Sequence, residues 1–169
     1  MYAQRVKGLL AAWILAAAQA ALAAGGWEAG TALPDLAGFG LEGTLPALKG
    51  QVAVLDFWAS WCGPCRASFP ELQALHARYK DQGVVFLGIN MDTDAKKMTT
   101  FLADHPVTFP VVRDAGQKVA KSAKIPAMPT TVIVGKDGVI REIHAGFTVK
   151  DGPAKLTAAI DQALKEAGK

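Results

Sequence analysis

The sequence predicts an α/β domain in which helices flank a central mixed β-sheet. A nearly continuous apolar run at residues 52–58 is followed by a helical pattern and by a second apolar run at residues 84–89. Two buried strands joined by a helix form a parallel pair with a right-handed crossover. Later in the chain, a tight turn at Lys136-Asp137-Gly138 joins two extended segments into an antiparallel hairpin. A sheet that contains both kinds of pair is mixed.

The crossover helix should begin near Cys62. Apolar residues then recur at steps of three and four, which places them on one helix face: Cys65, Phe69, Leu72, Leu75 and Tyr79. Before the first strand, residues 33–36 and 43–45 are short extended pieces separated by glycine turns. They indicate an N-terminal β extension folded as an edge hairpin.

A central helical insert should follow the second strand, capped by Asp94 and ended by His105-Pro106. A short extended segment at 109–112 and a brief helix at 115–123 come next. Strand 130–134 and its hairpin partner at 139–144 complete the sheet. Pro153 then opens a last helix, whose inward face carries Leu156, Ile160 and Leu164.

The chain of 169 residues is long enough for one ordinary domain, which we place at residues 31–167. Residues 1–24 have the pattern of an export signal, with two basic residues before an apolar, alanine-rich run. Ala21-Leu22-Ala23 fits the small-x-small cleavage pattern, and Ala18-Gln19-Ala20 is a second candidate. The alternative is an uncleaved N-terminal membrane anchor, although the run is shorter than the roughly 20 apolar residues of a membrane span.

The charge balance argues against nucleic acid as a partner. Removing Arg5 and Lys7 with the signal lowers the net charge from +3 to about +1. No basic stripe then remains to follow a phosphate backbone.

Both cysteines of the chain stand in Trp61-Cys62-Gly63-Pro64-Cys65, at the junction of a buried strand and a helix. A disulfide across four residues closes a very small loop and adds little stability. The free N–H groups and the positive dipole end of a helix lower the pKa of a thiol at that position. The motif therefore predicts thiol–disulfide chemistry with Cys62 exposed and Cys65 one turn further into the helix. The alternative is a zinc site, but no second cysteine pair exists and the three histidines are scattered.

At these residues the chain resembles the thioredoxin superfamily. The ten residues 56–65 follow the thioredoxin signature almost letter for letter, and Met128-Pro129-Thr130 stands at the place of the superfamily's cis-proline loop. Residues 33–36 and 48–51, Cys65-Arg66 with Phe69-Pro70, and the stretch 92–109 are most similar to the TlpA-like exported members. The resemblance covers residues 31–165 and implies a thioredoxin fold.

The resemblance also implies roles for individual residues. Cys62 would be the nucleophile and Cys65 the resolving thiol. Pro129 would be cis and present the Met128 backbone to an extended client chain, where an ordinary trans loop proline is the alternative. Trp61, Gly63 and Pro64 would complete the client-contacting surface, although Trp61 could instead be a core aromatic residue.

Asp56 is the most informative polar residue because it interrupts an otherwise apolar strand. A buried carboxylate is costly, which suggests a buried base that takes the proton of Cys65 during exchange. The alternative is a side chain that reaches solvent at the strand end. The lysine that thioredoxin places near this carboxylate is absent, and Gly88 stands at about its position.

The resemblance favours a periplasmic reductase of exported client disulfides, such as those of apocytochrome c or copper-site assembly proteins. Its electron donor would be a membrane thiol protein of the DsbD/CcdA type. We expect a monomer that needs no cofactor and lies in the periplasm, or is anchored in the inner membrane facing it. A disulfide oxidase or isomerase, a copper-binding assembly module and a peroxidase are alternatives on the same fold. Redox direction depends on potential and donor, which the sequence does not set. Met91, Met98 and Met128 are expected to fill the core rather than to bind copper.

Overall fold

The computed structural model describes residues 25–166, so the expected signal at residues 1–24 and the expected domain end at residue 167 lie outside them. The elements are η1 (Leu36–Phe39), β1 (Val52–Trp58), α2 (Gly63–Tyr79), η2 (Lys80–Gln82), β2 (Val84–Asn90), α3 (Ala95–Asp104), β3 (Val111–Arg113), α4 (Lys118–Ala123), β4 (Thr130–Val134), β5 (Ile140–Ala145) and α5 (Gly152–Glu166). Among these residues, no helix is long and apolar enough to cross a bilayer.

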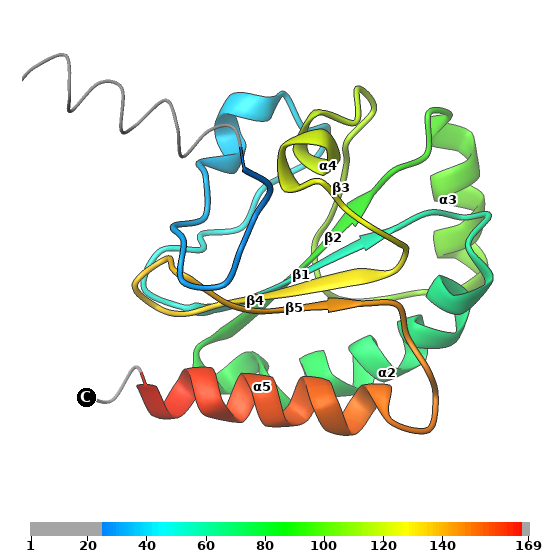
Figure 1. Cartoon of the computed structure of the whole chain (residues 1–169). Coiled ribbons are helices and arrows are strands. Elements are labelled where there is room, and N and C mark those ends of the chain that lie inside the picture. The colour runs from blue at the N-terminus through cyan, green and yellow to red at the C-terminus, as the bar shows by residue number, and fades with distance from the viewer. Residues whose placement is uncertain (1–24, 167–169) are drawn as a thin grey trace, which may run out of the picture.

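The five strands form one mixed sheet in the order β3-β2-β1-β4-β5, which confirms the predicted fold class. β1 pairs in parallel with β2, and β2 with β3, while β4 is antiparallel to both β1 and β5. α2 and α5 cover one face, and α4 and the N-terminal segment lie over the other (Figure 1). All seven residues of β1 are buried because helices or loops cover both faces of the central strand.

The N-terminal segment corrects one expectation. Residues 33–45 form no edge hairpin; they contain the 3₁₀ helix η1, which Asp35 caps by accepting the Ala37 N–H. Two isolated bridges, Ala32 with Val139 and Glu42 with Arg113, join this segment to the sheet region. The glycine turns that suggested a hairpin instead let the chain wrap around the domain, because Gly40 and Gly43 adopt positive φ.

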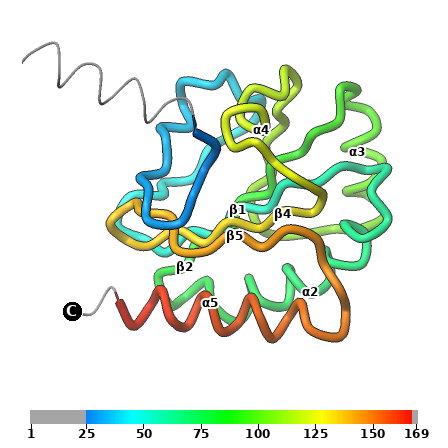
Figure 2. The backbone as a smooth tube through the Cα atoms, in the orientation of Figure 1, coloured from blue at the N-terminus to red at the C-terminus, as the bar shows by residue number. Residues whose placement is uncertain are grey.

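The packed unit also begins earlier than residue 31. Trp27 is buried, and its ring lies edge-on to Phe57 with 5.7 Å between centroids. Its backbone N–H donates to Ala123 at the end of α4, so segments far apart in the sequence lie side by side (Figure 2). Trp27 therefore belongs to the core.

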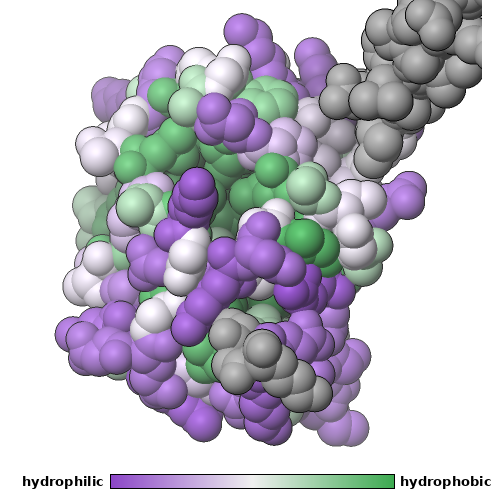
Figure 3. Space-filling model, turned by 90° about the vertical axis from the view of Figure 1, so that its left-hand side faces the viewer, coloured by the Kyte–Doolittle hydropathy of each residue, from purple (hydrophilic) through white to green (hydrophobic). Residues whose placement is uncertain are grey.

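An apolar groove of about 650 Å³ lies at the end of the molecule opposite to the start of α2. Apolar side chains gather in a hollow on this face (Figure 3). The groove is bounded by the N-terminal segment and the β4–β5 turn, and its apolar lining includes Leu33, Leu36, Leu45, Leu48 and Val134. The N-terminal segment therefore builds the end of the domain that is remote from the cysteines.

Helices α2 and α5 are joined by a partly buried hydrogen bond. Tyr79 of α2 is almost fully buried and donates its hydroxyl to Asp161 of α5 over 2.6 Å. Burial, with the nearby Asp161 carboxylate, raises the pKa of Tyr79 to about 12, so the phenol is neutral at physiological pH.

We predict that Tyr79→Phe lowers the free energy of unfolding by about 2 kcal/mol, because a hydrogen bond to a charged acceptor contributes ~1.5–3 kcal/mol. Urea unfolding of Tyr79→Phe, Asp161→Ala and the double variant measures it. Losses that simply add in the double variant would contradict a direct interaction between the two residues.

Candidate active site

Cys62 and Cys65 lie where β1 leaves the core and α2 begins. They form a disulfide with 5.2 Å between the Cα atoms. Cys62 is the N-cap of α2, and its Sγ accepts the N–H of Cys65 over 3.2 Å. Cys62 keeps 6% of its surface exposed, less than expected, while Cys65 has none. Cys62, which caps the helix, is thus the more accessible of the two residues.

The start of α2 suits a thiolate at Cys62. The helix begins at Gly63, so Pro64 is its second residue, and both are exposed. Proline fits this turn because no intrahelical acceptor awaits its missing N–H. The positive end of the helix dipole and the Cys65 N–H would favour the charged form of a reduced Cys62.

The two neighbouring tryptophans have opposite environments. Trp58 is fully buried and packs against Phe69 and Phe101, with ring centroids 4.6 Å and 4.8 Å away. Trp61 is 66% exposed directly before Cys62. Trp61 is therefore a surface residue beside the disulfide and not a core aromatic.

The Met128-Pro129 peptide bond is cis, as expected. Hydrogen bonds hold the loop: Thr130 Oγ1 donates to the Ala127 carbonyl over 2.6 Å, and Gly146 N–H donates to the Pro129 carbonyl over 2.7 Å. Pro129 is buried, whereas Met128 is half-buried. A groove of about 510 Å³ brings Met128 and Pro64 together and continues between β5 and the start of α5.

Asp56 lies inside the domain with 3% of its surface exposed, so it does not reach solvent at the strand end. Desolvation raises its pKa to about 7, against a weaker opposing effect of a hydrogen bond from Thr131. Thr131 Oγ1 donates to Oδ1 over 2.8 Å, and the buried Oδ2 has no hydrogen-bond partner among the described residues. Thr131 lies opposite Asp56 in the β1–β4 register, which the sequence could not reveal without the strand pairing.

The absence of a lysine next to Asp56 has a steric reason. Gly88 lies opposite Asp56 in the β1–β2 register, which confirms the position inferred from the sequence. A Cβ atom there would lie 3.1 Å from Trp58 Nε1 and 3.2 Å from Val111 Cγ2. A longer side chain at residue 88 would displace the buried Trp58, so Asp56 has no cation from this strand.

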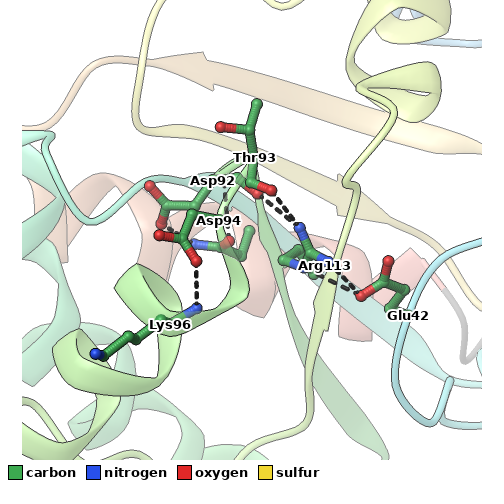
Figure 4. Close-up of polar contacts among 7 residues, drawn as sticks. Glu42, Asp92, Thr93, Asp94, Lys96 and Arg113 are labelled. Carbon is green, nitrogen blue, oxygen red and sulfur yellow. Dashed lines mark hydrogen bonds and ion pairs between the residues drawn. The ribbon is translucent and has the colours of Figure 1, made fainter.

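A second buried carboxylate, missed by the sequence analysis, holds the loop before Cys62. Asp92 accepts the N–H and the hydroxyl of Ser60 over 2.9 Å and 2.8 Å, and the side-chain amide of Asn90 over 2.8 Å. Arg113 donates to the backbone carbonyls of residues 92 and 93 and pairs with Glu42 over 2.6 Å (Figure 4). The N-terminal segment is thereby linked to the loop that carries the cysteines.

The described residues contain no cluster of three or more His, Cys, Asp or Glu side chains that could hold a metal ion. The geometry instead brings a redox-active cysteine pair, a buried carboxyl group and a cis-proline loop to one end of the sheet. This combination is the arrangement of the thioredoxin superfamily, and its cysteine pair fits thiol–disulfide exchange.

Comparison with known proteins agrees with this class. The chain belongs to the Redoxin family, whose profile matches residues 27–160. Thiol-disulfide oxidoreductase ResA of Oceanobacillus iheyensis is 37% identical over 107 residues, or 63% of this chain, and this chain spans 56% of that relative's length. ResA of Geobacillus kaustophilus is 31% identical over 131 residues, 78% of this chain and 74% of its own length.

A solved structure shares the fold. The crystal structure of a candidate thiol:disulfide interchange protein DsbE from Chlorobium tepidum is 33% identical and superimposes with a TM-score of 0.75. The match covers 82% of this chain and 99% of the other. The thioredoxin fold expected from the sequence is thereby confirmed.

We predict that limiting iodoacetamide labels Cys62 before Cys65 in the reduced protein near neutral pH. Only Cys62 combines some exposure with a position at the helix N-terminus. Mass spectrometry of the labelled peptides, with Cys62→Ser and Cys65→Ser variants as references, measures the order. Dominant label on Cys65 would contradict the assignment of Cys62 as the nucleophile.

We predict that Asp56→Asn raises stability at and above neutral pH. The pKa of Asp56 is about 7 in the folded protein against an ordinary value of 3.8, so the folded state binds this proton more tightly than the unfolded chain. The free energy of unfolding should therefore fall between about pH 4 and pH 7, by up to about 1.4 kcal/mol per pH unit.

Urea unfolding of wild type and Asp56→Asn across this range tests the prediction. The two curves should separate as the pH rises, with the variant the more stable at pH 8. Parallel curves would show that Asp56 does not titrate in this window.

Proposed function

We propose that this protein reduces disulfides in exported client proteins. The observation that carries the proposal is that Cys62, the more exposed residue of the Cys62–Cys65 disulfide, caps helix α2 and accepts the N–H of Cys65. Similar proteins named thiol-disulfide oxidoreductase and thiol:disulfide interchange protein support exchange chemistry. The Gly-Pro dipeptide, which resembles that of reducing members of the superfamily, supports the reducing direction.

The reaction cycle uses both cysteines. The Cys62 thiolate attacks one sulfur of a client disulfide, forms a mixed disulfide and releases the other client sulfur as a thiolate. Cys65 then loses its proton to Asp56 and attacks the Cys62 sulfur. The mixed disulfide breaks, the second client sulfur leaves as a thiolate, and the Cys62–Cys65 disulfide forms. Two electrons have passed to the client, and protons complete its two thiols.

Asp56 suits the role of base for Cys65. Its pKa near 7 lets it accept a proton and release it again at physiological pH, which a carboxyl group with an ordinary pKa would do poorly. Cys65 is fully buried, so its proton needs an acceptor inside the domain. Asp56 is the ionisable residue of the strand that leads to the cysteines.

The surface around Cys62 would hold an extended client chain. Gly63 and Pro64 are exposed, and Met128 borders the same groove as Pro64. The backbone of Met128-Pro129 would pair with the client, which tolerates many client sequences. Trp61 would add an apolar contact on the other side of the sulfur.

Apocytochrome c, followed by copper-site assembly proteins, is the client class that we propose, with a DsbD/CcdA-type membrane protein as electron donor. The signal-like residues 1–24 support a periplasmic location, either free or anchored to the inner membrane. Client and donor cysteines of these kinds are presented on that side of the membrane, where disulfides persist.

The test of direction is the reduction potential of the Cys62–Cys65 pair. Equilibration with dithiothreitol or glutathione buffers should give a value nearer to about −270 mV, as in thioredoxin, than to about −120 mV, as in strong oxidants of the superfamily. A value near −120 mV would assign the protein to disulfide formation instead of reduction.

We also predict that Trp61→Ala slows reduction of insulin by about fivefold and changes the reaction with the small disulfide dithiobis-nitrobenzoate much less. A lost aromatic contact of ~1 kcal/mol corresponds to this factor, and a small disulfide needs no extended contact. Val149→Ala is the matched control, because Val149 is also exposed, at 64%. Equal losses on both substrates would remove Trp61 from the client surface.

A further inference from the structure

Four residues form a row across the sheet next to the cysteine pair. Asp56 lies opposite Gly88 on β2 and opposite Thr131 on β4, and Thr131 lies opposite His144 on β5. Directly opposed residues of neighbouring strands point to the same face. This row therefore runs from the buried centre of the sheet to its edge, on the side that α2 and α5 cover.

Thr131 is the member of this row that touches both the buried acid and the solvent-accessible groove. Its hydroxyl donates to Asp56 Oδ1 over 2.8 Å. Thr131 also lines the groove of about 510 Å³, together with Pro64, Met128 and His144. Asp56 does not line this groove, and its Oδ2 is buried with no hydrogen-bond partner within residues 25–166. A proton that leaves Asp56 for the groove therefore meets the Thr131 hydroxyl.

We propose that Thr131 is a positioning residue that connects Asp56 to the groove, carries its proton to solvent and sets the pH at which Cys65 can react. The proposal rests on the proposed function, because it assigns the exit path of the proton that Cys65 gives to Asp56. It adds a residue that the sequence motif does not contain.

The proton balance needs no additional reactant. When Asp56 is ionised, the Thr131 hydroxyl donates its hydrogen to the carboxylate. After Cys65 has protonated Asp56, the carboxyl O–H donates to Thr131 Oγ1, and the threonine hydrogen turns to a water molecule in the groove. Transfer along this chain restores the Asp56 carboxylate, keeps one hydrogen on Thr131 and releases one proton to solvent.

The hydrogen bond also affects the acid itself. It favours the charged carboxylate and so partly opposes the rise in the pKa of Asp56 that burial causes. The other titratable groups near Thr131 are His144 and Glu142 of β5 and Lys155 of α5. His144 Nε2 lies 3.0 Å from Glu142, and β2 contributes only Gly88 to the row. The N-terminus of α2 contributes the cysteine pair, with Cys62 as the N-cap.

The first experiment follows the second thiol step of the fully reduced protein against pH. Dithiobis-nitrobenzoate releases one chromophore when Cys62 attacks and a second when Cys65 resolves the mixed disulfide. Thr131→Val should shift the acidic limb of the second release up by about one pH unit, which lowers its rate about tenfold on that limb. Thr131→Ser should restore the wild-type profile, because it keeps the hydroxyl.

Two further variants assign the titrating group. In an Asp56→Asn background, Thr131→Val should cause no additional shift, because Thr131 acts through Asp56. His144→Gln should leave the acidic limb in place. The proposal is overturned if Thr131→Val has the wild-type profile, if it shifts the profile equally without Asp56, or if the limb disappears with His144→Gln.

A readout without catalysis separates this proposal from the proposed function. The pH dependence of urea unfolding reports the protonation of Asp56 even in the disulfide form. Thr131→Val should move the midpoint of this pH dependence to higher pH, and Thr131→Ser should bring the midpoint back to its wild-type position. A protein with no exchange activity would refute the proposed function and leave this result intact, whereas an unmoved midpoint would refute the link to Thr131.

Discussion

The burial of β1 on both faces is the constraint on which the rest of the structure depends. Each of its seven residues is buried between two apolar layers, so its only ionisable side chain, Asp56, is removed from water. The chain must leave this layer after Trp58, at the carboxyl end of β1, and α2 starts a few residues further on. The same strand therefore buries the acid and leads directly to the loop and helix start that carry the cysteines.

Two carboxylates lie buried near the cysteine pair, and their environments differ. Asp92 accepts three hydrogen bonds, two from Ser60 and one from Asn90, and holds the loop before Cys62 in place. Asp56 accepts one hydrogen bond, from Thr131, and its Oδ2 has no partner in the part of the chain that the structure describes. A carboxylate with several donors supports structure, whereas one with few donors and a pKa near 7 can exchange protons.

Structural support of the cysteine loop and access to solvent lie in different parts of the domain. The N-terminal segment closes the apolar end of the fold and, through Glu42 and Arg113, reaches the support of the cysteine loop. The cis-proline loop and β5 border a groove on the other side of the cysteine pair, which Thr131 lines. The structural support and the solvent-accessible groove thus lie on different sides of the same cysteine pair.

The sequence alone determined much of the fold and of the cysteine motif, because local patterns encode both. Apolar runs, helix periodicity and the Lys136-Asp137-Gly138 turn predicted the mixed sheet and its helices, and the motif at Cys62 predicted the helix-capping disulfide. Only the tertiary structure decided what lies beside each residue: Thr131 as the partner of Asp56, Asp92 as the support of Ser60, and a 3₁₀ helix in place of the expected N-terminal hairpin. These depend on strand register and on contacts between distant segments, and no short stretch of sequence carries that information.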